Sequence, residues 1–313
     1  FATGCRPAIV RGAWCATASP AGAERSAAQH AAGDAVVLAG DVRRRIAGQV
    51  NGNAAEVLAG KGATLVLAGR SEERTAPVVE AITKAGGTAR FIRLDLGDLR
   101  QVDEVGPALA AGDEPVEILI NNAGLAGARG LTNDGFELAF GTNHLGHFLL
   151  TEHLLPKLRA SSYGGRIVNV ASRAHLRAAG IPWGDLRRST PSTTGLPEYG
   201  VSKLANVLHA KDLATRPENG GILAVSLHPG VIASDVWREV PSPLRWVMKL
   251  FMKSNEEGAE TTLHCATAPR EQLENGGYYV DSARGSESAV ARDAALAGEL
   301  RRRSEEWLAS YRR

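Results

Sequence analysis

Short runs of Val, Ile and Leu alternate with helix-like stretches along most of this chain, and this alternation restricts its fold more than any other feature. Two clear runs are ATLVLA at 63–68 and VEILI at 116–120. A strand that is apolar at every position is buried on both faces, which is typical of a parallel sheet covered by helices on both sides. Right-handed crossovers make that sheet doubly wound, with its ligand crevice at the carboxyl ends of the strands. We therefore predict an α/β fold built on a doubly wound parallel sheet.

The same pattern predicts the order of the elements. We expect strands over 35–39, 63–68, 89–94, 116–120, 166–170, 222–227 and 277–280, and helices over 53–60, 72–85, 132–160 and 198–215. Residues 34–285 would form one Rossmann-type domain, with 286–313 as a C-terminal helix packed on it. Residues 1–33 are rich in Ala, Gly, Ser and Arg and contain one acidic residue, Glu24. We expect an irregular or disordered segment there, and a targeting presequence is the alternative.

Charge, hydropathy and cysteine content exclude several classes of protein. Lys and Arg number 36 against 34 Asp and Glu, a formal net charge of +2, so the strong basic field of a nucleic-acid binder is missing. We find no transmembrane segment, because no apolar run reaches the roughly 18 residues that a spanning helix needs. Cys5, Cys15 and Cys265 are an odd number without zinc-site spacing. We expect neither a disulfide framework nor a metal site, and a reducing, cytoplasmic location.

Tyr199 and Lys203 lie four residues apart in Tyr-Gly-Val-Ser-Lys, on one face of a predicted helix. A phenol has an ordinary pKa of about 10, too high for a useful base at neutral pH. A neighbouring ammonium stabilises the phenolate and lowers that pKa, which suits an acid/base tyrosine. The pair alone has another explanation, a surface tyrosine packed on a lysine stem.

Two more polar residues indicate a reactive site. Ser172 follows the predicted strand 166–170, so its hydroxyl would project into the crevice. There it could donate a hydrogen bond to a carbonyl oxygen that gains negative charge, while capping a helix or turn is the alternative role. Asn143 lies within the predicted helix 132–160. A buried asparagine inside a helix is costly unless it is hydrogen-bonded, so we expect a polar network or an ordered water around it.

Five motifs occur in an order and approximate spacing that resemble the short-chain dehydrogenase/reductase family. They are Asn121-Asn-Ala-Gly124, Asn143-His-Leu-Gly-His-Phe148, Ser172, Tyr199-x-x-x-Lys203 and His228-Pro-Gly230. Three further stretches, 131–136, 181–186 and 202–208, look like the retinol-dehydrogenase-like branch, as does the gap of 27 positions from Ser172 to Tyr199. The resemblance runs from about residue 54 to about residue 285.

The resemblance implies a role for each matching residue. Tyr199 would exchange a proton with the substrate oxygen while a hydride moves between substrate carbon and nicotinamide, and Lys203 would lower the tyrosine pKa and hold the nicotinamide ribose. Ser172 would orient the carbonyl, and Asn143 would hold the helix bend and a proton-relaying water. The implied cofactor contacts are Asp95 and Leu96 at the adenine, Asn121, Ala123 and Gly124 near the ribose, and Pro229, Gly230, Ile232 and Ser234 on the nicotinamide side.

Arg70 bears on the choice of cofactor. It ends the second predicted strand, where a member of the family that prefers NAD would usually carry an acid for the ribose 2′-hydroxyl. The planar guanidinium can bind a phosphate through two hydrogen bonds, which suits the 2′-phosphate. We therefore favour NADP(H) over NAD(H), with a solvated arginine as the alternative.

The family's phosphate loop, Thr-Gly-x-x-x-Gly-x-Gly, is the one motif without a match. Its glycines permit the turn and let the backbone approach the pyrophosphate. Counting back from the second strand, they would fall at Arg45, Gln49 and Asn51. In one interpretation Gly40 opens a longer loop, Gly48 and Gly52 supply the close approaches, and Asn53 caps the helix. In the other, residues 1 to about 50 are not the family's natural sequence.

Together these residues predict an NADP(H)-dependent oxidoreductase that interconverts a carbonyl and a hydroxyl on a small, fairly apolar substrate. Tyr199 would be its acid/base. The alternative is a non-catalytic protein of the same fold, acting as a binding or scaffold protein, and the altered glycine loop is its only support. Members of the family are often dimeric or tetrameric, so a homo-oligomer is a further expectation.

Overall fold

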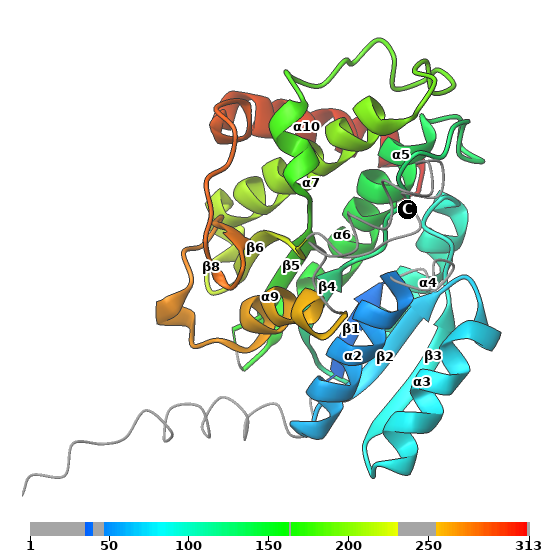
Figure 1. The fold of residues 1–313 in the computed structure, drawn as a ribbon, viewed down its shortest axis with the longest axis vertical. Helices are drawn as coiled ribbons and strands as arrows, with labels where there is room; N and C mark the ends of the chain where they lie inside the picture. The colour runs from blue at the N-terminus through cyan, green and yellow to red at the C-terminus, as the bar shows by residue number, and fades with distance from the viewer. Residues whose placement is uncertain (1–34, 40–46, 163, 231–254, 312–313) are drawn as a thin grey trace, which may run out of the picture.

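One sheet of eight strands organises the molecule. The computed structural model describes residues 35–39, 47–162, 164–230 and 255–311 (Figure 1). The strands lie in the order β3-β2-β1-β4-β5-β6-β7-β8, and all neighbours are parallel except β8, which pairs antiparallel with β7. Their bounds are β1 (Ala35–Ala39), β2 (Thr64–Gly69), β3 (Thr88–Arg93), β4 (Val116–Asn121), β5 (Arg166–Val170), β6 (Leu223–His228), β7 (Tyr278–Val280) and β8 (Ala283–Arg284). The chain reverses its direction of winding between β1 and β4, so the predicted doubly wound α/β fold is confirmed.

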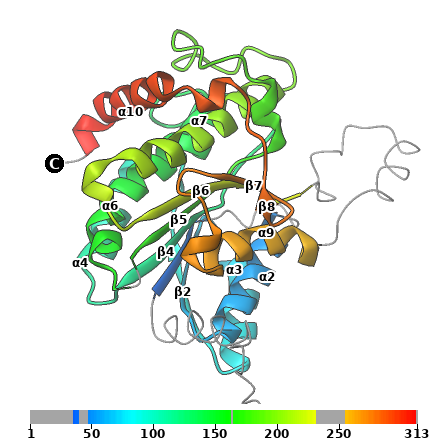
Figure 2. The same ribbon diagram turned by 90° about the vertical axis from the view of Figure 1, so that its left-hand side faces the viewer.

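Helices cover both faces of this sheet (Figures 1 and 2). One layer holds α2 (Ala47–Gly60), α3 (Glu72–Lys84) and α9 (Asn255–Thr267). The other holds α4 (Leu99–Ala111), α6 (Gly146–Ala160) and α7 (Leu196–Thr215), with α10 (Ala294–Leu308) packed against α7. None of the helices in these described ranges is long and apolar enough to cross a membrane.

The central strands are mostly apolar because both of their faces are covered. Every residue of β4, β5 and β6 is buried. Successive side chains point to opposite faces, so Leu119 and Ile167 join the core under α4, α6 and α7. Ile120 and Val168 join the core under α2, α3 and α9. These two cores fix the sheet and therefore the position of the residues that follow each strand.

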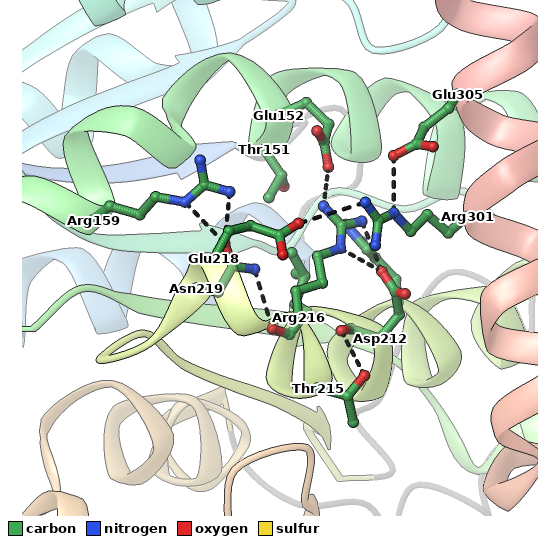
Figure 3. A network of polar contacts seen from close by, with 12 residues as sticks. Thr151, Glu152, Arg159, Asp212, Thr215, Arg216, Glu218, Asn219, Arg301 and Glu305 are labelled. Atoms are coloured by element: carbon green, nitrogen blue, oxygen red, sulfur yellow. Dashed lines mark hydrogen bonds and ion pairs between the residues drawn. The ribbon is translucent and has the colours of Figure 1, made fainter.

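A buried ion network ties the outer helices together (Figure 3). Arg216 lies just beyond α7, and its Nη1 contacts Glu152 Oε1 of α6 at 2.6 Å while its Nε donates to Asp212 Oδ2 at 2.7 Å. The three side chains are only 2, 5 and 8% exposed. Arg301 of α10 reaches Glu218 at 3.5 Å at the edge of the same network. Charge pairing therefore links α6, the end of α7 with the residues just after it, and α10.

Two helix boundaries differ from the predictions. The stretch predicted as one helix over 132–160 starts as a turn, since Gly135 has a φ of +74° and Leu131 bridges to Glu137. Helix follows as α5 (Leu138–Phe140), a π-helical segment η1 (Gly141–Leu145) and α6. The helix predicted over 53–60 begins instead at Ala47, so the prediction that Asn53 caps it is wrong. A glycine inside a helix costs only about 1 kcal/mol, and packing of the helix can offset that cost.

Candidate active site

Two segments meet at the carboxyl end of β5 and bring Ser172 to the start of α7. Ser172 caps the short 3-10 helix η2 (Arg173–Arg177), its Oγ accepting a hydrogen bond from Ala174 N–H at 3.2 Å. η2 packs on the first turns of α7, where Tyr199 lies. A Cβ at Gly200 would come 3.1 Å from the Ala174 carbonyl oxygen, so this glycine permits the close packing. Ser172 and Tyr199, both half-buried, thus share one edge of the sheet, and Ser172 also has the capping role.

Lys203 lies one turn along α7 from Tyr199 and is buried, with 2% of its surface exposed. Its Nζ is 5.7 Å from the centroid of the Tyr199 ring and donates a hydrogen bond to the Val170 carbonyl oxygen at 2.8 Å. Burial lowers the pKa of this amine to about 7. An ammonium has three N–H donors, and within the described residues only Val170 accepts from it. The amine is therefore suited to further acceptors from a bound molecule.

Asn143 links the loop after β4 to α7 from within the π-helical segment η1. Its Oδ1 accepts from Leu125 N–H at 2.9 Å, and its Nδ2 donates to Leu125 O at 3.0 Å and to Ser202 Oγ at 2.9 Å. Ser202 Oγ in turn donates to the Tyr199 carbonyl oxygen at 2.8 Å. The predicted polar network around Asn143 is confirmed. It explains how a fully buried amide is tolerated here, since its side-chain oxygen and nitrogen both have partners.

The side chain of Asn121, at the end of β4, is taken up by the core. Its Nδ2 donates to Asn169 Oδ1 at 2.9 Å and to Thr151 Oγ1 at 3.0 Å, and the residue is 1% exposed. This amide joins β4, β5 and α6 beneath the crevice. The predicted cofactor contact of Asn121 could therefore come only from its backbone, and it stays a prediction.

A pocket open to solvent lies at the carboxyl ends of β2, β3 and β4. Its lining combines an apolar floor with one acid and one arginine: Ala68, Arg70, Leu94, Asp95, Leu96, Ala123, Gly124, Leu125 and Thr142. The structure thus brings five predicted cofactor residues together, namely Arg70, Asp95, Leu96, Ala123 and Gly124. Leu125 and Thr142 were missed, although each stands next to a motif in the sequence. A Cβ at Gly124 would come 3.0 Å from Lys203 Nζ, so this glycine leaves room between the pocket and the amine.

The other predicted cofactor residues are not among the described residues that line this pocket. Pro229 and Gly230 follow β6 at the same edge of the sheet, and Gly230 has a φ of +96°, which only glycine adopts without strain. Gly48 and Gly52 lie inside α2, so their interpretation as loop glycines is wrong, although Gly48 is in the first helical turn. Gly40, Ile232 and Ser234 lie outside the described residues.

These residues fit a nicotinamide dinucleotide. An apolar pocket with an acid and an arginine at its rim suits an adenosine, and a glycine beside a buried amine suits a ribose whose hydroxyls accept hydrogen bonds. The pocket and Tyr199 lie at the same edge of the parallel sheet, near the switch in winding, where ligands of doubly wound folds bind. No group of three or more His, Cys, Asp or Glu side chains that could hold a metal ion occurs among the residues described.

Comparison with known proteins identifies the family. Residues 50–184 match the family described as short chain dehydrogenase. An uncharacterized oxidoreductase of Schizosaccharomyces pombe is 39% identical over 265 residues, covering 78% of this chain and 77% of that protein. Human retinol dehydrogenase 11 is 37% identical over 252 residues, covering 79% and 78%. The crystal structure of an uncharacterized protein from Mycobacterium paratuberculosis superposes with a TM-score of 0.69 at 30% identity, covering 89% and 94% of the two chains.

The family match covers β2 to β5 and the segments that line the pocket, and each of the two relatives covers more than three quarters of this chain. Their similarity agrees with the ordered motifs and with the observed topology. The chain belongs to the short-chain dehydrogenase/reductase family, in its retinol-dehydrogenase-like branch, and is an NAD(P)-dependent oxidoreductase.

Proposed function

We propose that the protein is an NADP(H)-dependent oxidoreductase that interconverts a carbonyl and a hydroxyl group on a small, fairly apolar substrate, with Tyr199 as acid/base. The observation that carries the proposal is the meeting of Ser172, Tyr199 and Lys203 at one end of β5, with the lysine amine buried beside the tyrosine ring. A phenol in this setting can lose and regain a proton at the substrate oxygen.

In the direction of reduction, negative charge would develop on the substrate oxygen as its carbon received the hydride that a nicotinamide, when bound, would supply. Ser172 Oγ already accepts a hydrogen bond from Ala174 N–H, so its own hydrogen is free to donate to that oxygen. Tyr199 Oη supplies the proton. In the direction of oxidation the same phenolic oxygen removes a proton from the alcohol.

Lys203 stabilises the tyrosinate that these steps require. Its amine lies under the ring at 5.7 Å from the centroid, in a site with little water. Burial holds the pKa of the amine near 7, so a negative charge on Tyr199 would draw it into its ammonium form. Neighbouring opposite charges of this kind lower the pKa of the phenol toward neutrality.

Arg70 supports the choice of NADP(H). It follows β2 directly and lines the same pocket as Asp95. A guanidinium at this position can pair with a 2′-phosphate, whereas a 2′-hydroxyl gains little from it. Loss of Arg70 should therefore weaken NADPH binding selectively.

Two exposed leucines support an apolar substrate. Leu176 of η2 is 48% exposed and Leu196, the first residue of α7, is 43% exposed. They lie on the two elements that carry Ser172 and Tyr199, so apolar surface accompanies the reactive groups. The relative named retinol dehydrogenase 11 acts, by its name, on an apolar alcohol.

Calorimetric titration with NADPH and NADH tests the cofactor proposal. We expect NADPH to bind at least about tenfold more tightly, since one charge-assisted contact to a phosphate contributes on the order of 1.5–3 kcal/mol. Arg70→Ser should remove the preference and leave NADH binding unchanged. Arg93→Ser, at the exposed end of the neighbouring strand β3, is the matched control. Equal affinity for both cofactors in the wild-type protein would refute the NADP(H) preference.

Tyr199→Phe tests the acid/base assignment with a panel of apolar aldehydes, ketones and alcohols. Turnover should fall by at least about a hundredfold, the usual contribution of a general acid/base, while NADPH affinity changes little. Full activity in this variant would remove Tyr199 from the mechanism. If neither cofactor bound and no substrate turned over, the non-catalytic alternative would replace the proposal.

A further inference from the structure

A fully buried histidine lies behind Ser172 and contacts its backbone. His175 is the third residue of η2 and has none of its surface exposed. Its Nδ1 lies 2.6 Å from the Ser172 carbonyl oxygen, and its backbone N–H donates to the same oxygen at 3.1 Å. One residue thus contributes two hydrogen bonds to the carbonyl group of the serine that would contact the substrate.

The hydrogen bond fixes which nitrogen of the imidazole carries the proton. A carbonyl oxygen can only accept, so Nδ1 must be the protonated nitrogen. Burial lowers the pKa of His175, which keeps the ring neutral and leaves Nε2 without a proton. A neutral ring with hydrogen on Nδ1 is therefore the form that the surroundings favour.

Tyr278 of β7 restricts the ring from another side. The two ring centroids are 4.7 Å apart with an interplanar angle of 70°, an edge-to-face contact, and Tyr278 is 1% exposed. The imidazole is thus enclosed between its own short helix and a strand of the sheet. Through it, the backbone of Ser172 is held against the sheet edge rather than by the short η2 turn alone.

We propose that His175 is a positioning residue, which holds Ser172 in its reactive placement through the Nδ1–H hydrogen bond to the Ser172 carbonyl oxygen. This inference rests on the proposed function, because it assumes that the Ser172 hydroxyl orients the substrate oxygen. The hydroxyl cannot position itself, since the one hydrogen bond that its oxygen makes within the described part of the chain, from Ala174 N–H at 3.2 Å, lies within the same short turn. The contact with His175 adds the second point of attachment.

Three substitutions separate the hydrogen bond from the volume of the ring. His175→Asn places an amide N–H close to where Nδ1 lies, His175→Gln places it near Nε2, and His175→Leu keeps the approximate size without a donor. We expect the kcat of His175→Asn to stay within about threefold of the wild-type value. The kcat of His175→Leu and of His175→Gln should fall on the order of 10- to 100-fold, because the Ser172 hydroxyl would be displaced from the substrate oxygen. The NADPH dissociation constant should stay within about twofold in all three, because His175 does not line the cofactor pocket.

A double-mutant cycle with Ser172→Ala shows whether His175 acts through Ser172. In the Ser172→Ala background, His175→Leu should lower kcat by less than about threefold further. The same loss in both backgrounds would overturn the proposal. His264→Leu is the matched control, since His264 is a half-buried imidazole 6.0 Å from the ring of the next tyrosine, Tyr279, on α9 away from Ser172. Its kcat should equal that of the wild type.

Histidine tautomers in ¹⁵N-labelled wild-type protein give a readout that needs no substrate. Two-bond ¹⁵N–¹H correlation spectra, assigned with His175→Asn, should show His175 as a neutral ring protonated on Nδ1 at pH 7. A ring protonated on Nε2 would overturn the proposal even if His175→Leu failed to fold. If the wild-type protein turned over none of the carbonyl substrates but showed the Nδ1–H form, the proposed function would fail while the positioning contact would stand.

Discussion

Replacing Lys203 with methionine should change how the stability of the cofactor-free protein depends on pH. The amine is 2% exposed and has one acceptor among the described residues, Val170 O. Burial lowers its pKa from an ordinary value of 10.5 to about 7. Folding therefore favours the uncharged amine, and the unfolded chain binds one more proton wherever the pH lies between these two values. Stability must rise with pH across that window.

The magnitude follows from the two pKa values. At pH 7 the folded amine is about half protonated and the unfolded amine fully so, and by pH 9 the folded amine has lost its proton. Summed over this range, unfolding of the wild-type protein should become harder by about 2 kcal/mol. Lys203→Met cannot titrate, so its free energy of unfolding should lack this increase.

Urea denaturation at pH 7, 8 and 9 measures the effect as a difference between the two proteins. The other titratable groups contribute equally to the pH dependence of both proteins, so their contributions cancel in the difference. One of them is Cys265, whose pKa burial raises to about 12, so that it opposes the trend near pH 9. The wild-type minus variant difference should increase by about 2 kcal/mol from pH 7 to pH 9. A difference that stays flat within about 0.5 kcal/mol would refute the claim that the fold holds this amine near neutrality.

Three further predictions concern stability and the crevice. Arg216→Met removes the arginine that pairs with the buried carboxylates of Glu152 and Asp212, and it should lower the free energy of unfolding by about 3–5 kcal/mol in urea denaturation. A loss below about 1 kcal/mol would contradict the burial of this network. Gly124→Ala should displace the Lys203 amine, because the new Cβ would come 3.0 Å from Nζ. Turnover should fall in steady-state assays while the circular dichroism spectrum stays that of the wild type, and unchanged turnover would contradict this prediction. Gly298 lies in α10, and a Cβ added there would have no atom within 4 Å. Gly298→Ala should therefore raise the free energy of unfolding by about 0.5–1 kcal/mol, seen as a higher melting temperature. A lower melting temperature would contradict this prediction.

The fold was predictable because its central strands are rich in apolar residues on both faces. β4, β5 and β6 are buried at every residue, and a run of this kind fits few arrangements other than a covered parallel sheet. The turn over 132–137 was not predictable, since it depends on a single positive φ at Gly135 and a backbone bridge. α4 was missed although Asp98 caps it through the N–H groups of Arg100 and Gln101, a signal that the sequence does contain.

The site was predictable where side chains of one helix or one strand end act together. Tyr199 and Lys203 are one helical turn apart, so their spacing alone places them side by side. The partners of Asn143 and His175 could not be found in this way, because both side chains bind backbone groups of Leu125 and Ser172. Backbone groups are present at every position and leave no mark in the sequence. The roles of these residues in the reaction stay predictions for the variants described above.

Two parts of the crevice, the one around Tyr199 and the one expected to bind the cofactor phosphates, are built from different segments of the chain. Asn143 is held by the backbone of Leu125 after β4, and Lys203 by the backbone of Val170 at the end of β5. Both side chains are buried, so we expect this half of the crevice to survive changes near the N-terminus. We expect binding of the cofactor phosphates to depend instead on the first turn of α2, which begins at Ala47. The first N–H groups of any helix lack partners within it, so they can meet a phosphate without the usual glycines if the chain before them leaves access. We therefore expect substitutions in the sequence just before α2 to change cofactor affinity rather than the position of Tyr199.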